Sequence, residues 1–383
     1  MTTNQLAQHP MASGGDEPAA TTATVPSAVR RNPLLRIRFD DGIQADVLLS
    51  GRTVQLPHGR FVTALSLLSG TTSTWEAVET IAHALCDGDV DAALDLLSEL
   101  LAADLVVDAA REFPSMAAVQ HWIDRGWLDA LVFHLRCGAV AFDDDGVDDV
   151  EQEQNRLLST IVEAGVPDLW KAYPGTDCVA LPEAQDRAEL PPLETVLLRR
   201  RSNRPWRRER ISLTDVATIL RLAGEELTTI RRKVEGVLHE QPSALLHSAF
   251  TALEIYVVAH AVDGLEPGLY HYAPDRQVLE SVRPGEMRDE MQRMCVGQQR
   301  AGSGAASFIV TGMWERYMYR YRYPHAYRTL LVNSAELAQK LILLATAVEL
   351  NTFVTPAFDD AYADELLGLD PLQEVAIEVV TVG

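Results

Sequence analysis

Residues 330–350, LLVNSAELAQKLILLATAVEL, decide the fold of the C-terminal half of the chain. Apolar side chains cover most faces of the helix expected here, which is typical of a helix at the centre of a domain or of an interface. A strand rich in β-branched residues stands on either side, ASFIVTGM at 306–313 and VAIEVVTV at 375–382. The pattern predicts a sheet that packs against a central helix.

The alternation of helices and strands extends back to about residue 191. PLETVLLRR at 192–200 and LTDVATILRLAG at 213–224 predict helices, and ALEIYVVAHAV at 252–262 predicts a strand. We therefore expect an α+β domain over 191–383, with a central mixed sheet that is rich in antiparallel pairs and flanked by helices.

The sequence upstream of this domain divides into three parts. Residues 1–31 are rich in Ala, Thr, Ser, Pro and Gly and lack periodic apolar residues, so we predict a disordered N-terminus. Residues 32–110 combine short strands with amphipathic helices, which predicts a small winged-helix-like domain. Residues 111–190 contain acidic and Pro-rich runs and predict a helical and acidic connector that drapes on the main domain.

The charge of the chain excludes several partners. With 33 basic and 55 acidic residues, the formal charge of −22 argues against nonspecific nucleic-acid or anionic-membrane binding.

The four cysteines lie far apart without zinc or disulfide spacing, and we expect no metal site. The N-terminus has no secretory pattern, and the longest strongly apolar run, LILLATAVEL at 341–350, is too short to cross a bilayer. We expect a soluble, cytoplasmic protein.

An arginine cluster stands out against this acidic background. The stretch RRRSNRPWRRER at 199–210 holds seven arginines. Guanidinium groups bind phosphate in a bidentate manner, so the cluster predicts a site for one small anion. The alternative is an exposed basic helix end, and we interpret Arg207, Arg208 and Arg210 as surface residues.

Five segments, in this order, resemble the flavin-dependent nitroreductase superfamily, and specifically its SagB-type branch of azoline dehydrogenases. They span about half of the chain and are RRSNRPW at 200–206, GLEPGLYHY at 264–272, YRYRYPHAYR at 319–328, LAQKLILLATAVEL at 337–350 and ELLGLD at 365–370.

The resemblance implies an FMN-dependent oxidoreductase that converts thiazoline or oxazoline rings of a ribosomally made precursor peptide to thiazoles or oxazoles. It implies that Arg200, Arg201 and Ser202 bind the FMN phosphate, with Arg204 nearby. It also implies a homodimer with the flavin at the dimer interface, and a cyclodehydratase as a partner.

The residues implied for proton transfer depart from the family pattern. The family has adjacent Lys and Tyr in the segment that matches YRYRYPHAYR, and the equivalents here are Arg320 and Tyr321. Because a guanidinium stays protonated, it cannot act as a general base. We therefore expect Tyr321 to take the proton and Arg320 to supply electrostatic support.

Two further departures fall in the implied flavin pocket. HSAFTA at 247–252 stands where the family has a Gly-rich, PSGGALHP-like element, and Ser248 is its candidate FMN contact. In the central helix, Glu336 stands at a family His position, whereas the FMN contact Gln339 is retained. Glu336 could equally be a solvent-facing helix residue.

The N-terminal domain resembles the PqqD-like modules that bind leader peptides in ribosomal-peptide enzymes. This resemblance implies that the leader adds as a strand to an edge of its sheet. DNA binding is the alternative for a winged helix, but the helices here carry too little positive charge.

Two other functions stay open. The altered HSAFTA segment and the missing Lys favour a catalytically degenerate subunit that binds the leader or scaffolds a peptide-modifying complex. A different flavin redox reaction is also compatible with the fold, because the fold alone does not select the chemistry.

Overall fold

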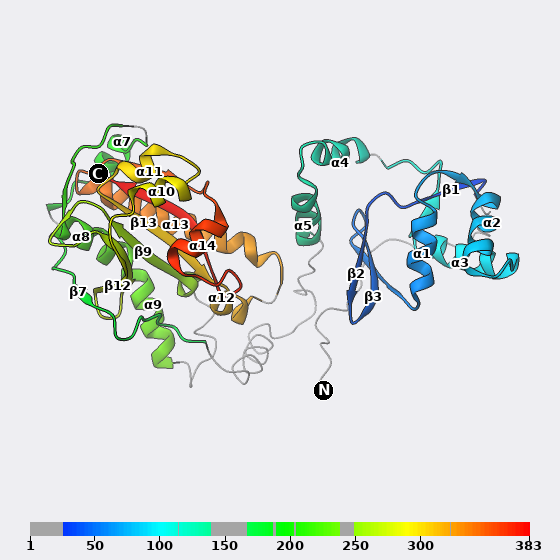
Figure 1. Cartoon of the computed structure of the whole chain (residues 1–383), viewed down its shortest axis with the longest axis horizontal. Helices are drawn as coiled ribbons and strands as arrows, with labels where there is room; N and C mark the ends of the chain where they lie inside the picture. The colour runs from blue at the N-terminus through cyan, green and yellow to red at the C-terminus, as the bar shows by residue number, and fades with distance from the viewer. Residues whose placement is uncertain are drawn as a thin grey trace. The chain divides into compact units, whose positions relative to one another are not determined.

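The structure, a computed structural model, describes most of the chain, without the side chains of Ala249, Phe250 and Arg320; the described residues are 26–113, 115–138, 167–186, 189–202, 204–237, 249–321 and 323–383. They belong to two compact units, residues 1–143 and residues 144–383 (Figure 1).

The first unit contains two small antiparallel sheets. β1 (Ala28–Arg31) lies between β5 (Thr72–Ser73) and β6 (Val106–Asp108), so the last four residues of the predicted disordered N-terminus form a central strand, because they pair on both sides. The other sheet is a meander in the order β2 (Leu35–Asp40), β3 (Gly42–Val47) and β4 (Arg52–Leu56). Because β3 lies in the middle, β2 and β4 are its edge strands.

Helices α1 (Gly59–Leu67), α2 (Thr74–Leu85) and α3 (Val90–Ala102) share one apolar core with these strands. The backbone N–H of Glu76 donates to the side chain of Ser73, which caps α2. The core residues alternate along β3 and recur at helical spacing along α3, and they include Ala45, Val47, Phe61, Leu65, Ile81, Leu96, Leu97 and Leu100. The predicted small domain of strands and helices is confirmed.

The predicted connector divides between the two units. Helices α4 (Met116–Ile123) and α5 (Leu128–Gly138) place Val119 and Leu131 against Leu34 and Leu48 of the first unit. The acidic run of residues 143–154 lies outside the described residues. From residue 167 onward the chain packs on the second unit, where β7 (Cys178–Ala180) joins the sheet.

The second unit is built on a seven-stranded sheet in which every strand pair is antiparallel. A short parallel pair beside it joins β8 (Ile211–Ser212) to β10 (Val262–Asp263). The predicted antiparallel-rich architecture is confirmed. Across the sheet the strands are β14 (Thr352–Thr355), β15 (Glu374–Val382), β13 (Ala306–Met313), β9 (Leu253–Ala259), β11 (Gly268–Ala273), β12 (Val278–Pro284) and β7.

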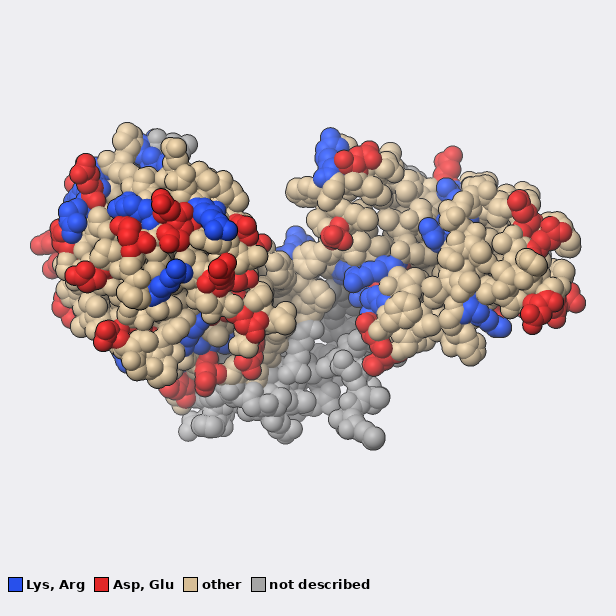
Figure 2. Space-filling view, in the orientation of Figure 1, with Lys and Arg blue, Asp and Glu red and all other residues tan. Residues whose placement is uncertain are grey.

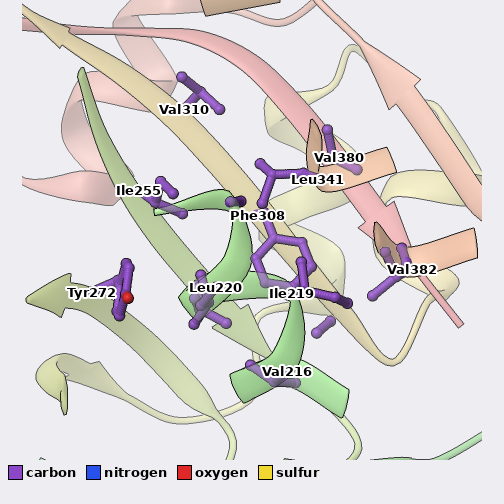
Figure 3. Close-up of a cluster of buried hydrophobic side chains, with 14 of the residues drawn as sticks. Val216, Ile219, Leu220, Ile255, Tyr272, Phe308, Val310, Leu341, Val380 and Val382 are labelled. Atoms are coloured by element: carbon purple, nitrogen blue, oxygen red, sulfur yellow. The ribbon is translucent and has the colours of Figure 1, made fainter. Parts of the chain in front are cut away.

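Helices cover both faces of this sheet. On one face, α13 (Ala326–Ala347) and α8 (Leu213–Ala223) pack Leu341 and Ile219 against Phe308 and Val380 (Figure 3). On the other face, α10 (Arg288–Met294) and α14 (Asp360–Leu367) pack against side chains such as Ile309. The remaining elements are α7 (Leu193–Arg199), α9 (Glu225–Val237), the short helix η4 (Ala249–Ala252), α11 (Gln299–Ser303) and α12 (Trp314–Arg320).

Helix α13 is the central helix that the sequence predicted. Among the described residues it is the one helix long and apolar enough to cross a membrane by length and composition, and it exceeds the ten-residue run singled out above. Ten of its residues are instead buried, and it packs against β13, β15 and α8.

Candidate functional site

The arginine cluster is fixed at the C-terminal end of α13. Arg199 and Arg207 both form ion pairs with Glu349, two residues beyond that helix, at 3.5 and 3.9 Å. The side-chain amide of Asn351 donates to the carbonyl oxygen of Pro205 at 2.6 Å. These ion pairs and this hydrogen bond therefore hold the loop that follows α7 against residues 349–351.

The outer arginines of the cluster have carboxylate partners. Arg208 forms an ion pair with Asp215 at 3.0 Å, and Arg210 forms one with Asp263 at 2.7 Å. Together with Arg207, these side chains are exposed, as the sequence interpretation expected. Arg208 and Arg210 therefore fasten the loop to α8 and β10.

The inner residues of the cluster have no carboxylate partner in the part of the chain that the structure describes. Arg200 Nη1 donates to Ser202 Oγ at 2.8 Å, and Arg201 Nη1 donates to the carbonyl oxygen of Arg200 at 2.7 Å. Within the described residues, neither of these guanidinium groups nor that of Arg204 pairs with a carboxylate. Guanidinium and hydroxyl donors without a counter-charge fit a dianionic phosphate, such as that of FMN.

The altered flavin-loop segment is only partly described. Ser248 and His247 lie outside the described residues, and the backbone becomes described at η4. This short helix contacts α9, α12 and α13. The carbonyl oxygen of Thr251 accepts hydrogen bonds from Arg231 at 3.3 Å and from Arg316 at 3.4 Å. The structure therefore brings the end of HSAFTA beside α12, which carries the candidate proton-transfer residues.

Tyr321 stands at the C-terminal end of α12 in a row of aromatic rings. Its N–H donates to the carbonyl oxygen of Tyr317 at 3.0 Å. The ring centroid of Tyr321 lies 4.8 Å from that of Tyr317 and 6.0 Å from that of Tyr323. Tyr321 is half-buried, whereas the side chain of Arg320 lies outside the described residues.

A buried group of charges beside α12 was missed by sequence reasoning. The Glu254 carboxylate, on β9, pairs with Arg231 of α9, with Arg316 of α12 and with His271 Nε2. Burial alone would raise the pKa of Glu254, but the two guanidinium groups and the imidazole hold it well below its usual range. A sequence signal did exist, because Glu254 interrupts the apolar strand LEIYVVA.

His271 links Glu254 to a second buried carboxylate. Its Nδ1 lies 2.9 Å from Glu280 Oε2, and Arg276 binds the same carboxylate at 2.6 Å. Although burial opposes both shifts, these hydrogen bonds raise the pKa of His271 and lower that of Glu280 to about 2. His271 is therefore a structural residue that joins two buried carboxylates.

The two groups of candidate residues lie toward opposite ends of α13. The arginine cluster contacts Glu349 beyond its C-terminal end. Tyr321 precedes its N-terminal end, where the ring of Trp314 on α12 stacks on Tyr327 with centroids 5.5 Å apart. A helix of 22 residues is about 33 Å long, which is far longer than one FMN molecule. The cluster and Tyr321 are therefore associated with opposite ends of one long helix.

Gln339 and Glu336 lie on the exposed side of α13, near its middle. Glu336 pairs with Lys340 one turn away at 3.6 Å, which supports its interpretation as a solvent-facing helix residue. Gln339 is not brought next to the arginine cluster or to Tyr321 within one chain.

Comparisons with known proteins agree with the fold. The nitroreductase family model matches residues 197–383. Trifolitoxin operon protein TfxC of Rhizobium leguminosarum bv. trifolii is 30% identical over 372 residues, 93% of this chain and 100% of that protein. Microcin B17-processing protein McbC of Escherichia coli is 26% identical over 103 residues, 27% of this chain and 38% of that protein. A chain of the E. coli microcin synthetase McbBCD complex, solved with truncated pro-MccB17 bound, has a TM-score of 0.38 at 17% identity, covering 72% of this chain and 98% of that one.

Proposed function

The chain belongs to the nitroreductase family, and we propose that it is an FMN-dependent dehydrogenase that oxidises thiazoline or oxazoline rings of a ribosomally made precursor peptide. The observation that carries this proposal is the inner arginine cluster, whose charge no described carboxylate balances. A precursor peptide is proposed as the substrate because two relatives are named for the trifolitoxin operon and for microcin B17 processing.

The chain offers distinct residues to the two ends of the cofactor. Arg200, Arg201 and Ser202, with Arg204 beside them, bind the phosphate through charge-assisted hydrogen bonds. Ser248 and Gln339 are the candidate contacts elsewhere along the cofactor. When bound, FMN would supply the acceptor for the hydride, two electrons and one hydrogen, that leaves the ring besides the proton.

Tyr321 and Arg320 are the proposed residues for removing the proton of the ring carbon and for stabilising the charge that results. In its ionised form, Tyr321 takes at Oη the proton that leaves the ring carbon. Arg320 stabilises the negative charge that develops on the substrate as that proton leaves. The half-buried position of Tyr321 among Tyr317 and Tyr323 limits the access of water to this step.

A homodimer resolves the separation of the two groups of residues. In the proposed dimer, the cluster of one chain holds FMN beside Tyr321 of a second copy. Support comes from large apolar side chains that α7 and α13 leave exposed on neighbouring surfaces, since such patches mark interaction sites. They are Leu193, Leu197, Leu198, Leu331 and Val332.

The first unit is the proposed binding site for the leader of the precursor peptide. β2 and β4 are edge strands of the meander, and an extended peptide binds such an edge by backbone hydrogen bonds. DNA is a poor partner, because residues 74–102 hold seven acidic residues and no Lys or Arg. Figure 2 shows acidic side chains over α2 and α3 on the face drawn.

Leader binding can be tested by hydrogen exchange. Addition of the precursor peptide is expected to protect amides of one edge strand, β2 or β4, from exchange, while β3 is already paired on both sides. Protection at neither edge contradicts strand addition. The protein is proposed to act in the cytoplasm after a cyclodehydratase has formed the rings.

The proposed function is tested by the visible spectrum of the purified protein, with the released cofactor identified after denaturation. We expect stoichiometric FMN and oxidation of azoline rings in a cyclised precursor peptide, without a nicotinamide requirement. A colourless protein that takes up no FMN contradicts the proposal. It favours the alternative, a catalytically degenerate subunit, which is also suggested by Arg320 at the position where the family has Lys. A strict NAD(P)H requirement indicates a different flavin reaction.

A further inference from the structure

A short segment of the second unit, residues 168–173, packs directly on the helix that ends before Tyr321. The carbonyl oxygen of Asp168 accepts a hydrogen bond from Arg316 Nε on α12 at 2.5 Å. Leu169 is buried in a small cluster with Tyr319 of α12 and Val234 of α9. The first two residues of the segment therefore contact α12 through one polar and one apolar contact.

The other residues of the segment are anchored in the sheet. Lys171 Nζ pairs with Glu374 of β15 and donates to the hydroxyl of Tyr256 on β9. The hydroxyls of Tyr173 and Tyr256 lie 2.8 Å apart, and the N–H of Tyr173 donates to Glu280 at 3.0 Å. The segment thus connects α12 to three strands, β9, β12 and β15.

The charge of Glu374 makes this anchor strong. The Glu374 side chain is 4% exposed, and its other hydrogen bond comes from Thr311 at 2.5 Å. Among the described residues, Lys171 is the one cation that pairs with it. Because a buried carboxylate without a counter-charge is costly, the folded state favours a docked Lys171. Burial lowers the pKa of Lys171, but Glu374 more than offsets this and keeps the ammonium charged.

We propose that residues 168–173 are a positioning segment for α12, whose Arg316 binds both Glu254 and the backbone of this segment. By fixing α12, the segment sets where Arg320 and Tyr321 stand relative to the substrate ring. The last point rests on the proposed function, whereas the mechanical role of the segment does not.

Hydrogen exchange of the full chain tests the mechanical role. Lys171→Met is expected to speed exchange of the α12 amides, residues 314–321, by about tenfold or more and to leave the buried middle of α13 unchanged. Lys340→Met is the matched control, because it removes a Lys whose ion pairs with Glu226 and Glu336 are partly exposed, and α12 should exchange as in the wild type. Unchanged α12 exchange in Lys171→Met overturns the proposal.

A charge-neutral double variant separates positioning from general stability. Lys171→Met with Glu374→Gln removes both charges and should recover thermal stability, while α12 still exchanges fast and kcat stays low at unchanged KM and FMN content. If kcat and α12 exchange recover together with stability, the role is structural only and the proposal fails. If Lys171→Met does not fold, Leu169→Ala applies the same test, because it removes the contact with Tyr319 and keeps the charges.

The two proposals fail separately. Fast α12 exchange in Lys171→Met supports the positioning role even in a protein that oxidises no azoline ring, which would contradict only the proposed function. Normal α12 exchange in a protein that does oxidise these rings contradicts only the positioning role.

Discussion

Arg316 of α12 pairs with Glu254 of β9 at a place that solvent scarcely reaches, since their side chains are 2% and 1% exposed. The same carboxylate pairs with Arg231 of α9 at 3.1 Å. One acidic side chain therefore ties two helices to the middle of the sheet, and its loss leaves two buried guanidinium groups without a full counter-charge.

We expect Glu254→Gln to lower the free energy of unfolding by about 3–5 kcal/mol, because it leaves the buried guanidinium groups that pair with Glu254 without their counter-charge. Chemical denaturation measures the change. Asp263→Asn is the matched control, since it removes the exposed pair with Arg210 and should cost no more than about 1 kcal/mol. Equal effects of the two substitutions would show that Glu254 is not the centre of a buried network.

The buried carboxylates predict acid sensitivity. The folded-state pKa of Glu280 is lowered to about 2, so its ionised form stabilises the protein above the pKa it has when unfolded. This stability is lost as the pH falls toward the folded-state value. Urea unfolding midpoints should therefore decline from about pH 5 toward pH 2, and Glu280→Gln should flatten that decline. If the urea midpoints of the variant decline with falling pH as steeply as those of the wild type, Glu280 is not a source of the acid sensitivity.

Arg200→Ala with Arg201→Ala is expected to weaken FMN binding by about a hundredfold or more, because each charged donor to a phosphate contributes about 1.5–3 kcal/mol. Flavin absorbance after desalting measures the loss. Arg207→Ala with Arg210→Ala removes the same number of charges from partnered, exposed positions and should leave the flavin content unchanged. Equal losses in both double variants would mean that overall charge, and not the inner site, attracts the cofactor.

Tyr321→Phe is expected to reduce ring oxidation by about 10²- to 10⁴-fold at normal FMN content, since it removes only the oxygen that takes the proton. Turnover of a cyclised precursor peptide is the measurement. Tyr327→Phe provides the control, because Tyr327 is exposed and stacks on Trp314 near the same helix end. Normal turnover in Tyr321→Phe removes this residue from the mechanism.

The shared site across a dimer predicts complementation between defective chains. Each of the two variants, Arg200→Ala with Arg201→Ala and Tyr321→Phe, should be inactive alone. Refolded together at equal amounts, they should regain about a quarter of wild-type activity, because half of the dimers are mixed and each mixed dimer has one intact site. If cluster and tyrosine served the same site within one chain, mixing would restore nothing.

Local sequence patterns predicted much of the fold but little of the charge pairing. The central helix, its flanking strands and the arginine cluster are visible because periodicity and composition act over short stretches. Lys171 and Glu374 are 203 residues apart, and nothing near either residue indicates the other. Likewise, the packing of α4 on Leu34 depends on tertiary contacts that a helical pattern does not encode. The candidate site residues come from a resemblance and stay a prediction, and their distribution toward the two ends of α13 could be seen only in the structure.

Strand β7 has a consequence for the behaviour of the protein at high concentration. It pairs with β12 at one edge of the seven-stranded sheet, through Val278, Leu279 and Glu280. An uncovered edge presents backbone donors and acceptors to any other extended chain, and such edges start aggregation. By pairing with residues 278–280, the three-residue strand β7 replaces this part of the edge of β12 with a very short edge strand, which is one way in which proteins limit edge pairing. Variants that loosen β7 are therefore expected to aggregate before they unfold.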